Sequence, residues 1–357
     1  MIFLINLIVI TFYSGINCIA DFQSFWNKYV DIGYIDRCKL YESCSETCVN
    51  KDMQALHKSL TANLYGQPLA LTSVYKTLSA HLLGDPERPL ALSLHGPTGV
   101  GKNHIARLIV NSLYKLGYKS SFVHYFVASR DFPDYENKDQ QQNYKRWLSK
   151  TIEQKAWKCP YSLFIFDEMD KMPINLIDVI SSFLDFHSHE ISSPSRSIID
   201  FRKSIFIFLS NTGERLIVNH TLNAWKSNRN RDDLRLDEFE VMLTNSAFNE
   251  NGGLWHTDLI KRHLISFFVP LLPLEGRHIR KCITRYLIKR NYTKLIDNSR
   301  FALDVMNELI FIPPGLEIFS SSGCKRIPEK VELVKLNYYE ESQQYSFKEE
   351  QVHYEEL

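Results

Sequence analysis

Residues 90–116 read LALSLHGPTGVGKNHIARLIVNSLYKL, and this stretch decides the fold. An apolar run predicts a buried strand (Leu90–Leu94), a glycine-rich loop follows, and an amphipathic pattern predicts a helix (Ile105–Leu116). The loop has the spacing G-x₄-G-K, in which glycines let backbone N–H groups surround a phosphate and the lysine neutralises its oxygens. We therefore expect a triphosphate site at Gly96, Pro97, Thr98, Gly99, Val100, Gly101, Lys102 and Asn103. The alternative for the loop alone is a chance glycine-rich turn.

A second apolar run ends in two carboxylates, Asp167 and Glu168. A buried strand presents acids only at its end, so this pair is expected beside the phosphate loop. Asp167 is expected to hold Mg²⁺ through water, and Glu168 to act as the base that activates the attacking water. Asn103 stands where a Ser or Thr is usual and offers an amide oxygen to the same ion or its water. An Asp-Glu pair alone has a simpler interpretation as a solvated turn.

A third apolar run, Ile205–Leu209, leads to Ser210 and Asn211. If this run is a neighbouring parallel strand, Asn211 reaches the same edge of the sheet and can orient the attacking water against the γ-phosphate. Three strand ends then converge on one phosphate.

The fold predicted from these runs is α/β. Four segments are expected to be buried strands: Leu90–Leu94, Phe122–Val127, Leu163–Phe166 and Ile205–Leu209. Helical patterns separate them, and this alternation is typical of a parallel sheet between two layers of helices. Upstream, residues 53–83 predict two helices that are broken at Gly66-Gln67-Pro68.

The length of 357 residues favours about two domains. We expect the α/β domain to span residues 51–275, because the strand patterns fade after Pro270 and Pro273, which read as a linker. Residues 276–339 are expected to form a small helical lid. The tail, residues 340–357, holds six Glu against one Lys and is expected to be solvated and disordered.

The start of the chain has an apolar run, Ile2–Tyr13, that is too short for a membrane span of about 20 residues. We interpret residues 1–20 as a cleaved signal peptide and residues 21–50 as an N-terminal arm. An uncleaved anchor or a buried first helix is the alternative. Asn219 and Asn291 begin glycosylation sequons, and six Cys remain after Cys18, an even number that permits disulfides in pairings that the spacing leaves open.

The net charge of the chain does not favour binding to a polyanion, although a local basic patch could still bind one. Lys plus Arg minus Asp plus Glu is 42 − 41 = +1, so no nucleic-acid partner is expected. The basic residues of the segment 226–235 alternate with Asp232 and Asp233, which favours a solvated loop or a partner site. His187 and His189 lack further ligands at metal spacing and are expected to be surface histidines.

Phosphate loop, Asp-Glu strand and Asn-tipped strand in this order resemble the AAA+ ATPases. Several short sequence motifs more specifically resemble those of the torsins, the AAA+ members of the endoplasmic reticulum and nuclear envelope lumen. This resemblance extends from about Cys38 to Tyr339. The segments that carry this resemblance are GPTGVGKN, FIFDEMDKM, FIFLSNTG, LWHTDLIKRHLISFFVPLLPLE and FSSSGCK. The resemblance implies a P-loop AAA+ three-layer sandwich followed by a small helical lid.

Several roles follow from the resemblance alone. It implies a nucleotide pocket from Gly96 to His104 that binds ATP with Mg²⁺, water activation by Glu168, a sensor at Asn211 and a second sensor at Lys325. It also makes two cysteines of the lid candidates for a redox pair that couples thiol state to nucleotide binding, Cys282 and Cys324. The alternative is a structural disulfide or two buried thiols.

The resemblance further implies slow ATP hydrolysis, association into ATP-dependent oligomers, and activation by lumenal domains of membrane-anchored partners that supply an arginine finger. Arg262 falls near the position of the finger in related unfoldases, although an exposed face is the more usual role of such a residue. Charges in residues 21–37 leave only peripheral or partner-mediated membrane contact. The function expected is chaperone-like remodelling of protein complexes. The alternatives are a nucleotide-gated scaffold without productive turnover and a cytosolic AAA+ protein.

Overall fold

The computed structural model describes residues 37–133, 138–185, 199–250 and 252–338. The expected signal peptide, most of the N-terminal arm, the acidic tail and the two histidines at 187 and 189 lie outside these residues. None of the helices in these described residues combines the length and the hydropathy that a membrane span needs.

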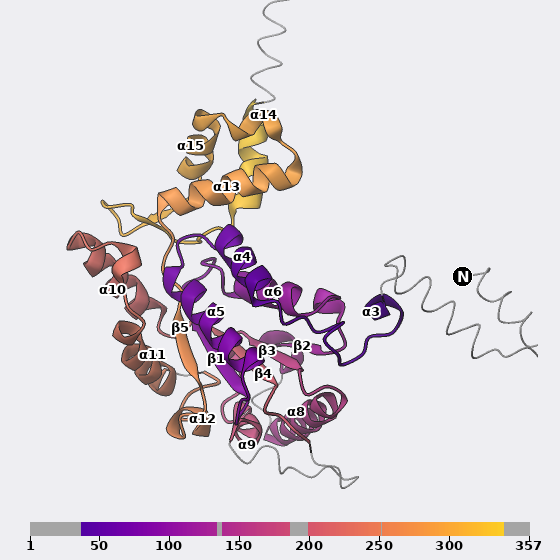
Figure 1. Cartoon of the computed structure of the whole chain (residues 1–357). Helices are drawn as coiled ribbons and strands as arrows, with labels where there is room; N and C mark the ends of the chain where they lie inside the picture. Colours follow the sequence, from indigo (N-terminus) through magenta and orange to yellow (C-terminus); the bar gives the residue numbers. More distant parts are fainter. Residues whose placement is uncertain (1–36, 134–137, 186–198, 251, 339–357) are drawn as a thin grey trace, which may run out of the picture.

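A five-stranded parallel sheet forms the centre of the molecule (Figure 1), in the order β2-β3-β4-β1-β5. Four strands confirm the expected ones: β1 (Leu90–His95), β2 (Val123–Val127), β3 (Leu163–Asp167) and β4 (Ile205–Ser210). The segment around Pro270 and Pro273 was interpreted as a linker, and this interpretation was wrong for Pro270. Residues Phe267–Pro270 form a fifth strand, β5, that pairs with β1. It is short and lies at an edge of the sheet, where a proline is tolerated.

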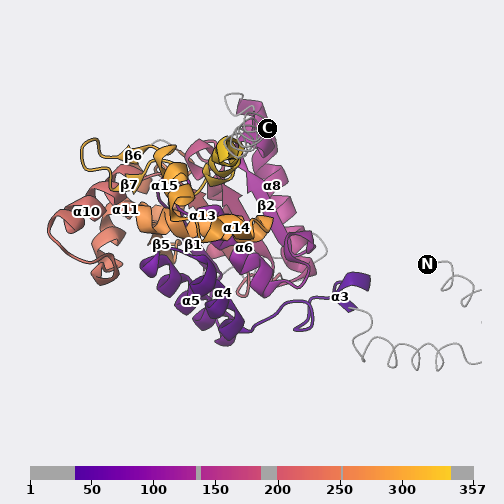
Figure 2. The same cartoon turned by 90° about the horizontal axis from the view of Figure 1, so that it is seen from above.

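Helices cover both faces of the sheet, as the alternating side chains of its strands require. Ile205, Ile207 and Leu209 pack into one apolar cluster with helices α4 (Met53–Asn63), α5 (Pro68–Leu83) and α6 (Lys102–Leu113). Phe206 and Phe208 point into the other cluster, which is covered by helices α8 (Lys138–Lys158), α9 (Ser181–Leu184), α11 (Asp237–Asn249) and α12 (Asp258–Lys261). Figure 2 shows α4 and α5 on one side of the sheet and α8 on the opposite side. The three-layer α/β architecture is confirmed.

The break between the first two helices lies where it was predicted, since α4 ends at Asn63 and α5 begins at Pro68. The helix after the phosphate loop is shifted from its expected bounds, because α6 begins at Lys102 itself and ends at Leu113. Its N-cap, Gly101, lies in the loop, so the helix N-terminus directly follows the glycine-rich turn. This brings the partial positive charge of the helix end to the loop.

The C-terminal helices gather at one end of the sheet (Figure 1). They are α13 (Gly276–Arg290), α14 (Thr293–Ile296), α15 (Ser299–Asn307) and a helix over residues 327–338. The expectation of a purely helical segment was wrong in one respect. Phe311–Ile312 (β6) and Phe319–Ser320 (β7) form a two-stranded antiparallel sheet between α15 and the last helix. Helix α10 (Glu214–Lys226) and a short α3 (Arg37–Leu40) and α7 (Ala128–Asp131) complete the helices described.

The six described cysteines form three disulfides. Cys38 is bonded to Cys48, Cys44 to Cys159, and Cys282 to Cys324. The second of these ties the described part of the N-terminal arm to the segment that precedes β3. The third lies among the C-terminal helices beside the site described next.

Candidate nucleotide-binding site

Three adjacent strands end at the same edge of the sheet, because β3, β4 and β1 are parallel neighbours. Their ends carry Asp167 and Glu168, Asn211, and the loop before α6. A pocket of about 670 Å³ lies at this edge. It is lined by most of the predicted site residues: Thr98, Gly99, Val100, Gly101, Lys102, Asn103, His104, Asp167, Glu168, Asn211 and Lys325. Gly96 and Pro97 begin the same loop and contact Lys102 through their carbonyls.

Lys102 is held in the centre of this site by neutral oxygens. Its Nζ donates to the carbonyl of Gly96 at 2.5 Å, to that of Pro97 at 2.9 Å, and to Oδ1 of Asn211 at 2.8 Å. Burial lowers the pKa of Lys102 to about 8, against the opposing pull of Asp170 and other nearby acids. A desolvated cation whose direct partners are uncharged is a strong site for an anion, because a phosphate would restore the missing negative charge.

Asp167 and Asn103 lie together, as a magnesium site requires. Nδ2 of Asn103 donates to Oδ2 of Asp167 at 2.7 Å, and the hydroxyl of Tyr125 donates to the same oxygen at 2.5 Å. Carboxylate and amide oxygens are ligands that suit Mg²⁺, which keeps several waters and is usually bound by one or two carboxylates plus substrate phosphates. The described residues contain no cluster of three or more His, Cys, Asp or Glu side chains that would enclose a metal. The donor set therefore fits Mg²⁺ carried with a triphosphate.

Glu168 lines the pocket, and its carboxylate already has two side-chain partners. Oγ of Ser129, just after β2, donates to Oε2 at 2.5 Å, and Nζ of Lys171 lies 2.8 Å from Oε1. The hydrogen bonds from Lys171 and Ser129 lower the pKa of Glu168 below its ordinary value. Its carboxylate is therefore ionised at neutral pH, as a base must be.

Asn211 links Lys102 to an acid that the sequence reasoning missed. Its side-chain Oδ1 accepts from Lys102, and its Nδ2 and backbone N donate to Asp170 at 3.2–3.4 Å. Asp170 also lines the pocket. The signal was present in the spacing Asp167-Glu168-Met169-Asp170, but an acid after the end of a strand is indistinguishable from a solvated turn residue in a single sequence.

Two buried side chains, His95 and Gln67, hold the phosphate loop in place through hydrogen bonds. The sequence analysis predicted no role for either of them. His95, the last residue of β1, has Nε2 2.7 Å from Oγ of Ser93 and Nδ1 3.0 Å from the carbonyl of Thr212. The carbonyl only accepts, so we assign the proton to Nδ1. Gln67 donates to the carbonyls of Val100 and Leu272 and accepts from the N–H of Leu272. These bonds join the phosphate loop to the segment that follows β4 and to the chain that leads into α13.

The burial of His95 predicts a pH-dependent stability. Burial lowers the pKa of His95 to about 4, whereas an unfolded histidine titrates near 6.5. Between these values the unfolded state binds the proton and the folded state does not, so stability falls as pH drops below about 6.5, by at most about 1.4 kcal/mol per pH unit for this group. Thermal unfolding of full-length protein at pH 5 and pH 7.5 measures the difference.

The matched comparison uses two substitutions. His95→Gln is expected to reduce the difference between the unfolding temperatures at the two pH values. His57→Gln, at an exposed position on α4, is expected to leave it unchanged. An undiminished difference in His95→Gln would show that the buried imidazole does not contribute to the acid sensitivity.

The C-terminal segment contacts the phosphate loop through a backbone hydrogen bond and a close approach of two glycines. The N–H of Cys324 donates to the carbonyl of Gly99 at 3.1 Å, and a Cβ placed on Gly323 would lie 2.3 Å from that carbonyl oxygen. Gly323 has φ +52°, a conformation that side chains rarely adopt. Lys325 follows directly, so this contact places the second predicted sensor beside the loop.

Gly323→Ala is therefore expected to lower stability by about 1–3 kcal/mol through strain at positive φ, with a further loss from the clash with Gly99. Gly315→Ala is the matched control, because Gly315 has φ +82° but nothing within 4 Å of its added Cβ. Unfolding temperatures of both variants, with nucleotide affinity, separate the two effects. If the two variants have equal unfolding temperatures and equal nucleotide affinities, the close approach of Gly323 to Gly99 contributes nothing to stability or binding.

Arg262 lies outside this pocket. It caps the end of α12, is about half exposed and pairs with Asp185. It therefore has no contact with the phosphate loop of its own chain.

Comparison with known proteins identifies the family. A family model described as Torsin matches residues 38–166. A torsin-like protein of Caenorhabditis elegans is 41% identical over 323 residues, which cover 90% of this chain and 86% of that protein. The chain belongs to the torsin family. A torsin-like protein of Drosophila melanogaster is 34% identical over 299 residues, 83% of this torsin and 85% of the relative.

Solved structures place this torsin among the AAA+ folds. The S. cerevisiae Hsp104-ADP complex superposes with a TM-score of 0.56 at 17% identity, covering 88% of this chain. A closed state of Hsp104 with ATPγS and casein gives a TM-score of 0.56 at 16% identity over 81% of this chain. The matched regions make up 52% and 47% of those chains, so the torsin spans about half the length of Hsp104. The α/β AAA+ fold is shared.

Proposed function

We propose that this torsin is an ATP hydrolase that remodels protein complexes in the lumen of the endoplasmic reticulum and the perinuclear space. The observation that carries the proposal is the convergence of Lys102, Glu168 and Asn211 on one pocket beside a glycine-rich loop. Membership in the torsin family and the AAA+ fold support the same function.

Each residue has a role in the proposed reaction. The N–H groups of the loop and the cation of Lys102 hold the phosphates, whose charge replaces the neutral oxygens that Lys102 now contacts. Asn211 orients a water against the γ-phosphorus, and Glu168 accepts its proton as the water oxygen bonds to phosphorus. The bond from the γ-phosphorus to the bridging oxygen breaks, which gives ADP and inorganic phosphate. Lys325 is proposed to sense the γ-phosphate from the C-terminal segment.

Asp167 and Asn103 are proposed to hold Mg²⁺, directly or through water. The ion would neutralise charge on the phosphate oxygens. The bond from Tyr125 fixes the carboxylate of Asp167 at the end of β3, and Nδ2 of Asn103 donates to Asp167, so the amide oxygen of Asn103 is the atom proposed for the ion or its water.

Slow basal turnover with activation by a partner is the third part of the proposal. Glu168 is engaged by Ser129 and Lys171, and Arg262 is paired with Asp185. A lumenal domain of a membrane-anchored activator would supply the arginine finger, which is worth about 10³–10⁵ in turnover in related enzymes. Association of ATP-bound copies belongs to the same proposal, and any membrane contact would be peripheral or through partners.

A lumenal location is supported by the cysteines. The three disulfides bond all six described cysteines, as is typical of an oxidising compartment. The side chains of Asn219 and Asn291 are both exposed, so each has room for a glycan in the folded protein. A loss of mass at these two positions after glycosidase treatment would support lumenal passage, and unmodified Asn219 and Asn291 would argue against it.

The bridge between Cys282 and Cys324 is proposed to regulate nucleotide binding. Cys282 and Cys324 line the pocket, and the backbone N–H of Cys324 donates a hydrogen bond to the carbonyl of Gly99. Breaking the bridge releases the turn with Lys325 from α13, and a loss of about 1 kcal/mol would weaken ATP binding roughly fivefold. Cys282→Ser/Cys324→Ser is the test, and Cys38→Ser/Cys48→Ser, which removes a bridge away from the pocket, is the control. Equal ATP affinities in the two variants would reject the regulatory role.

Phosphate release from ATP, measured for full-length protein with and without a cognate partner ectodomain, tests the proposed function. Release that rises with the partner supports the enzyme. ATP binding without release under either condition supports the alternative, a nucleotide-gated scaffold.

A further inference from the structure

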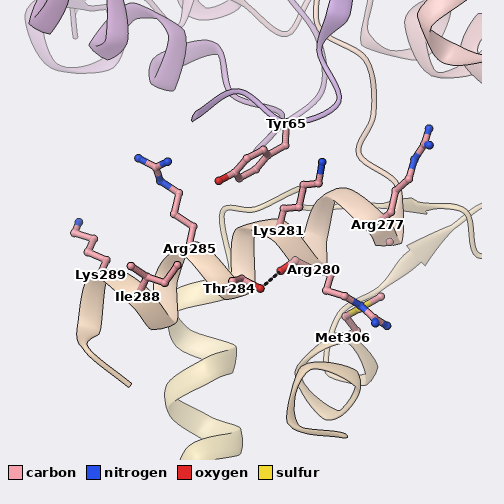
Figure 3. Close-up of a pocket in the computed structure, with 10 residues that line it drawn as sticks. Tyr65, Arg277, Arg280, Lys281, Thr284, Arg285, Ile288, Lys289 and Met306 are labelled. Atoms are coloured by element: carbon pink, nitrogen blue, oxygen red, sulfur yellow. Dashed lines mark hydrogen bonds between the residues drawn. The ribbon is translucent and has the colours of Figure 1, made fainter. Parts of the chain in front are cut away.

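Helix α13 carries an unbroken row of cations on one face. Arg277, Lys281, Arg285 and Lys289 recur at every fourth position, and Arg280 projects from the other side of the helix, toward Met306. Figure 3 shows these side chains projecting from α13, with Tyr65 facing Lys281 and Arg285 from the segment between α4 and α5. Together with Tyr65, Thr284, Ile288 and Met306 they line a groove of about 1000 Å³. We call this the α13 groove.

Among the described residues, only one cation of this row has an acidic partner. The α13 groove has no carboxylate in its lining, and Arg277 pairs at its edge with Glu275 at 2.8 Å. In the part of the chain that the structure describes, no ion pair joins Arg280, Lys281, Arg285 or Lys289 to an acid. Like charges four residues apart destabilise a helix by about 0.2–0.5 kcal/mol per pair. The row therefore costs the fold free energy, which a bound anion would offset.

We propose that the α13 groove docks an extended acidic segment of a partner protein. Residues four apart on a helix lie about 6 Å apart along its axis. Alternate residues of an extended chain lie about 6.6 Å apart on one side. A segment with carboxylates at every second position therefore matches Arg277, Lys281, Arg285 and Lys289 in register. Tyr65 and Ile288 offer apolar contact to its other side chains.

The shape and position of the groove select this occupant. A groove that sets apolar side chains beside a row of cations fits one extended peptide chain. The chain itself has acids after residue 339, but the last described helix, residues 327–338, runs from the level of α13 away from α4 (Figure 1). The described chain therefore ends on the side of α13 opposite Tyr65. A segment from another protein approaches the groove directly.

Docking here would act on the nucleotide pocket. Tyr65, Arg285 and Lys289 line both the α13 groove and that pocket. A docked segment would lie across the shared opening and slow nucleotide exchange. This second effect rests on the proposed function, whereas docking itself does not.

The experiment measures binding of a fluorescein-labelled peptide of eight alternating Ser and Glu residues to full-length protein by anisotropy. A Ser-Gln peptide and a single-stranded oligonucleotide of equal charge are the comparison ligands. We expect saturable binding of the acidic peptide that weakens with salt, and no comparable binding of the other two. Stronger binding of the oligonucleotide, or equal binding of the Ser-Gln peptide, would overturn the proposal.

Variants locate the peptide. Arg280→Glu/Lys281→Glu changes two exposed residues that line the α13 groove but not the nucleotide pocket, and should weaken peptide binding about tenfold with ATP affinity unchanged. Lys150→Glu/Lys226→Glu makes the same charge change at exposed positions elsewhere and should have little effect. Equal losses in both variants would reject the site. The alternative occupant of the groove is this chain's own acidic segment, residues 340–357, and replacing its six Glu with Gln tests it. A resulting gain in peptide affinity would show that this segment competes for the groove, and would overturn the assignment to a partner.

A fluorescent ADP analogue provides the second readout. Its dissociation should slow when the acidic peptide is present. If the peptide binds but the analogue is never bound, the proposed nucleotide function fails while the docking site stands. If the analogue dissociates at the same rate with and without bound peptide, the link between the two sites is rejected.

Discussion

Replacing Glu168 with glutamine is expected to lower partner-stimulated phosphate release by about 10²–10⁴-fold, the usual contribution of a general base. Glutamine keeps the size of the side chain and can still accept from Ser129, but it cannot take a proton from water. ATP affinity should change little, because Glu168 does not contact Lys102 or the loop that holds the phosphates. The ion pair with Lys171 is partly exposed, so its loss should cost little stability.

The measurement compares phosphate release and ATP binding for Glu168→Gln and for Lys171→Ala. The second variant removes the partner of the carboxylate and keeps the carboxylate itself, so it should retain most of the activity. Glu168→Gln should instead remain bound to ATP and to its protein partner, which makes it a trap for identifying clients. Full phosphate release by Glu168→Gln would remove Glu168 from the proposed mechanism.

Lys102→Ala is expected to weaken ATP binding by about 2–5 kcal/mol, the usual cost of removing one member of a buried charge pair, or roughly 30-fold to 5,000-fold. The reason is that the ammonium group is largely desolvated, which is also why its pKa falls to about 8, and a triphosphate is the partner that would repay this cost. The fold should survive, because alanine removes a buried cation whose present partners are neutral.

Isothermal titration with Mg·ATP measures this loss, and unfolding temperatures verify that the variant is folded. Lys58→Ala, at an exposed position on α4, is the control and should bind as the unmodified protein does. If Lys102→Ala is folded and keeps its affinity for ATP, the lysine does not contact the phosphates.

The part of the site predicted from sequence is the part built from strand ends. Asp167, Asn211 and the phosphate loop each follow an apolar run, and parallel strands carry such ends to one edge. That topology needs no knowledge of distant contacts, which is why these three meet as expected. Strands β1 to β4 and the helix break before Pro68 could be predicted for the same reason, since the hydrophobic period and the turn residues are local signals.

The rest depends on contacts between segments distant in sequence. Gln67 bonds to Leu272, 205 residues away, yet in the sequence it is only a polar residue in a helix break. β5 is only four residues long, and its proline suggests a linker in the sequence. Only its pairing with β1 in the structure identifies the segment as a strand. Asp170 and His95 acquire their roles from Asn211 and Thr212. No periodicity or spacing of a single sequence marks such partners.

The most direct test of the account is a structure of the Glu168→Gln variant determined with Mg·ATP. The account predicts one nucleotide whose phosphates are held by the loop from Gly96 to Asn103, with Lys102 and Asn211 at the γ-phosphate and the metal beside Asp167. A nucleotide bound elsewhere, or none at saturating ATP, would contradict it.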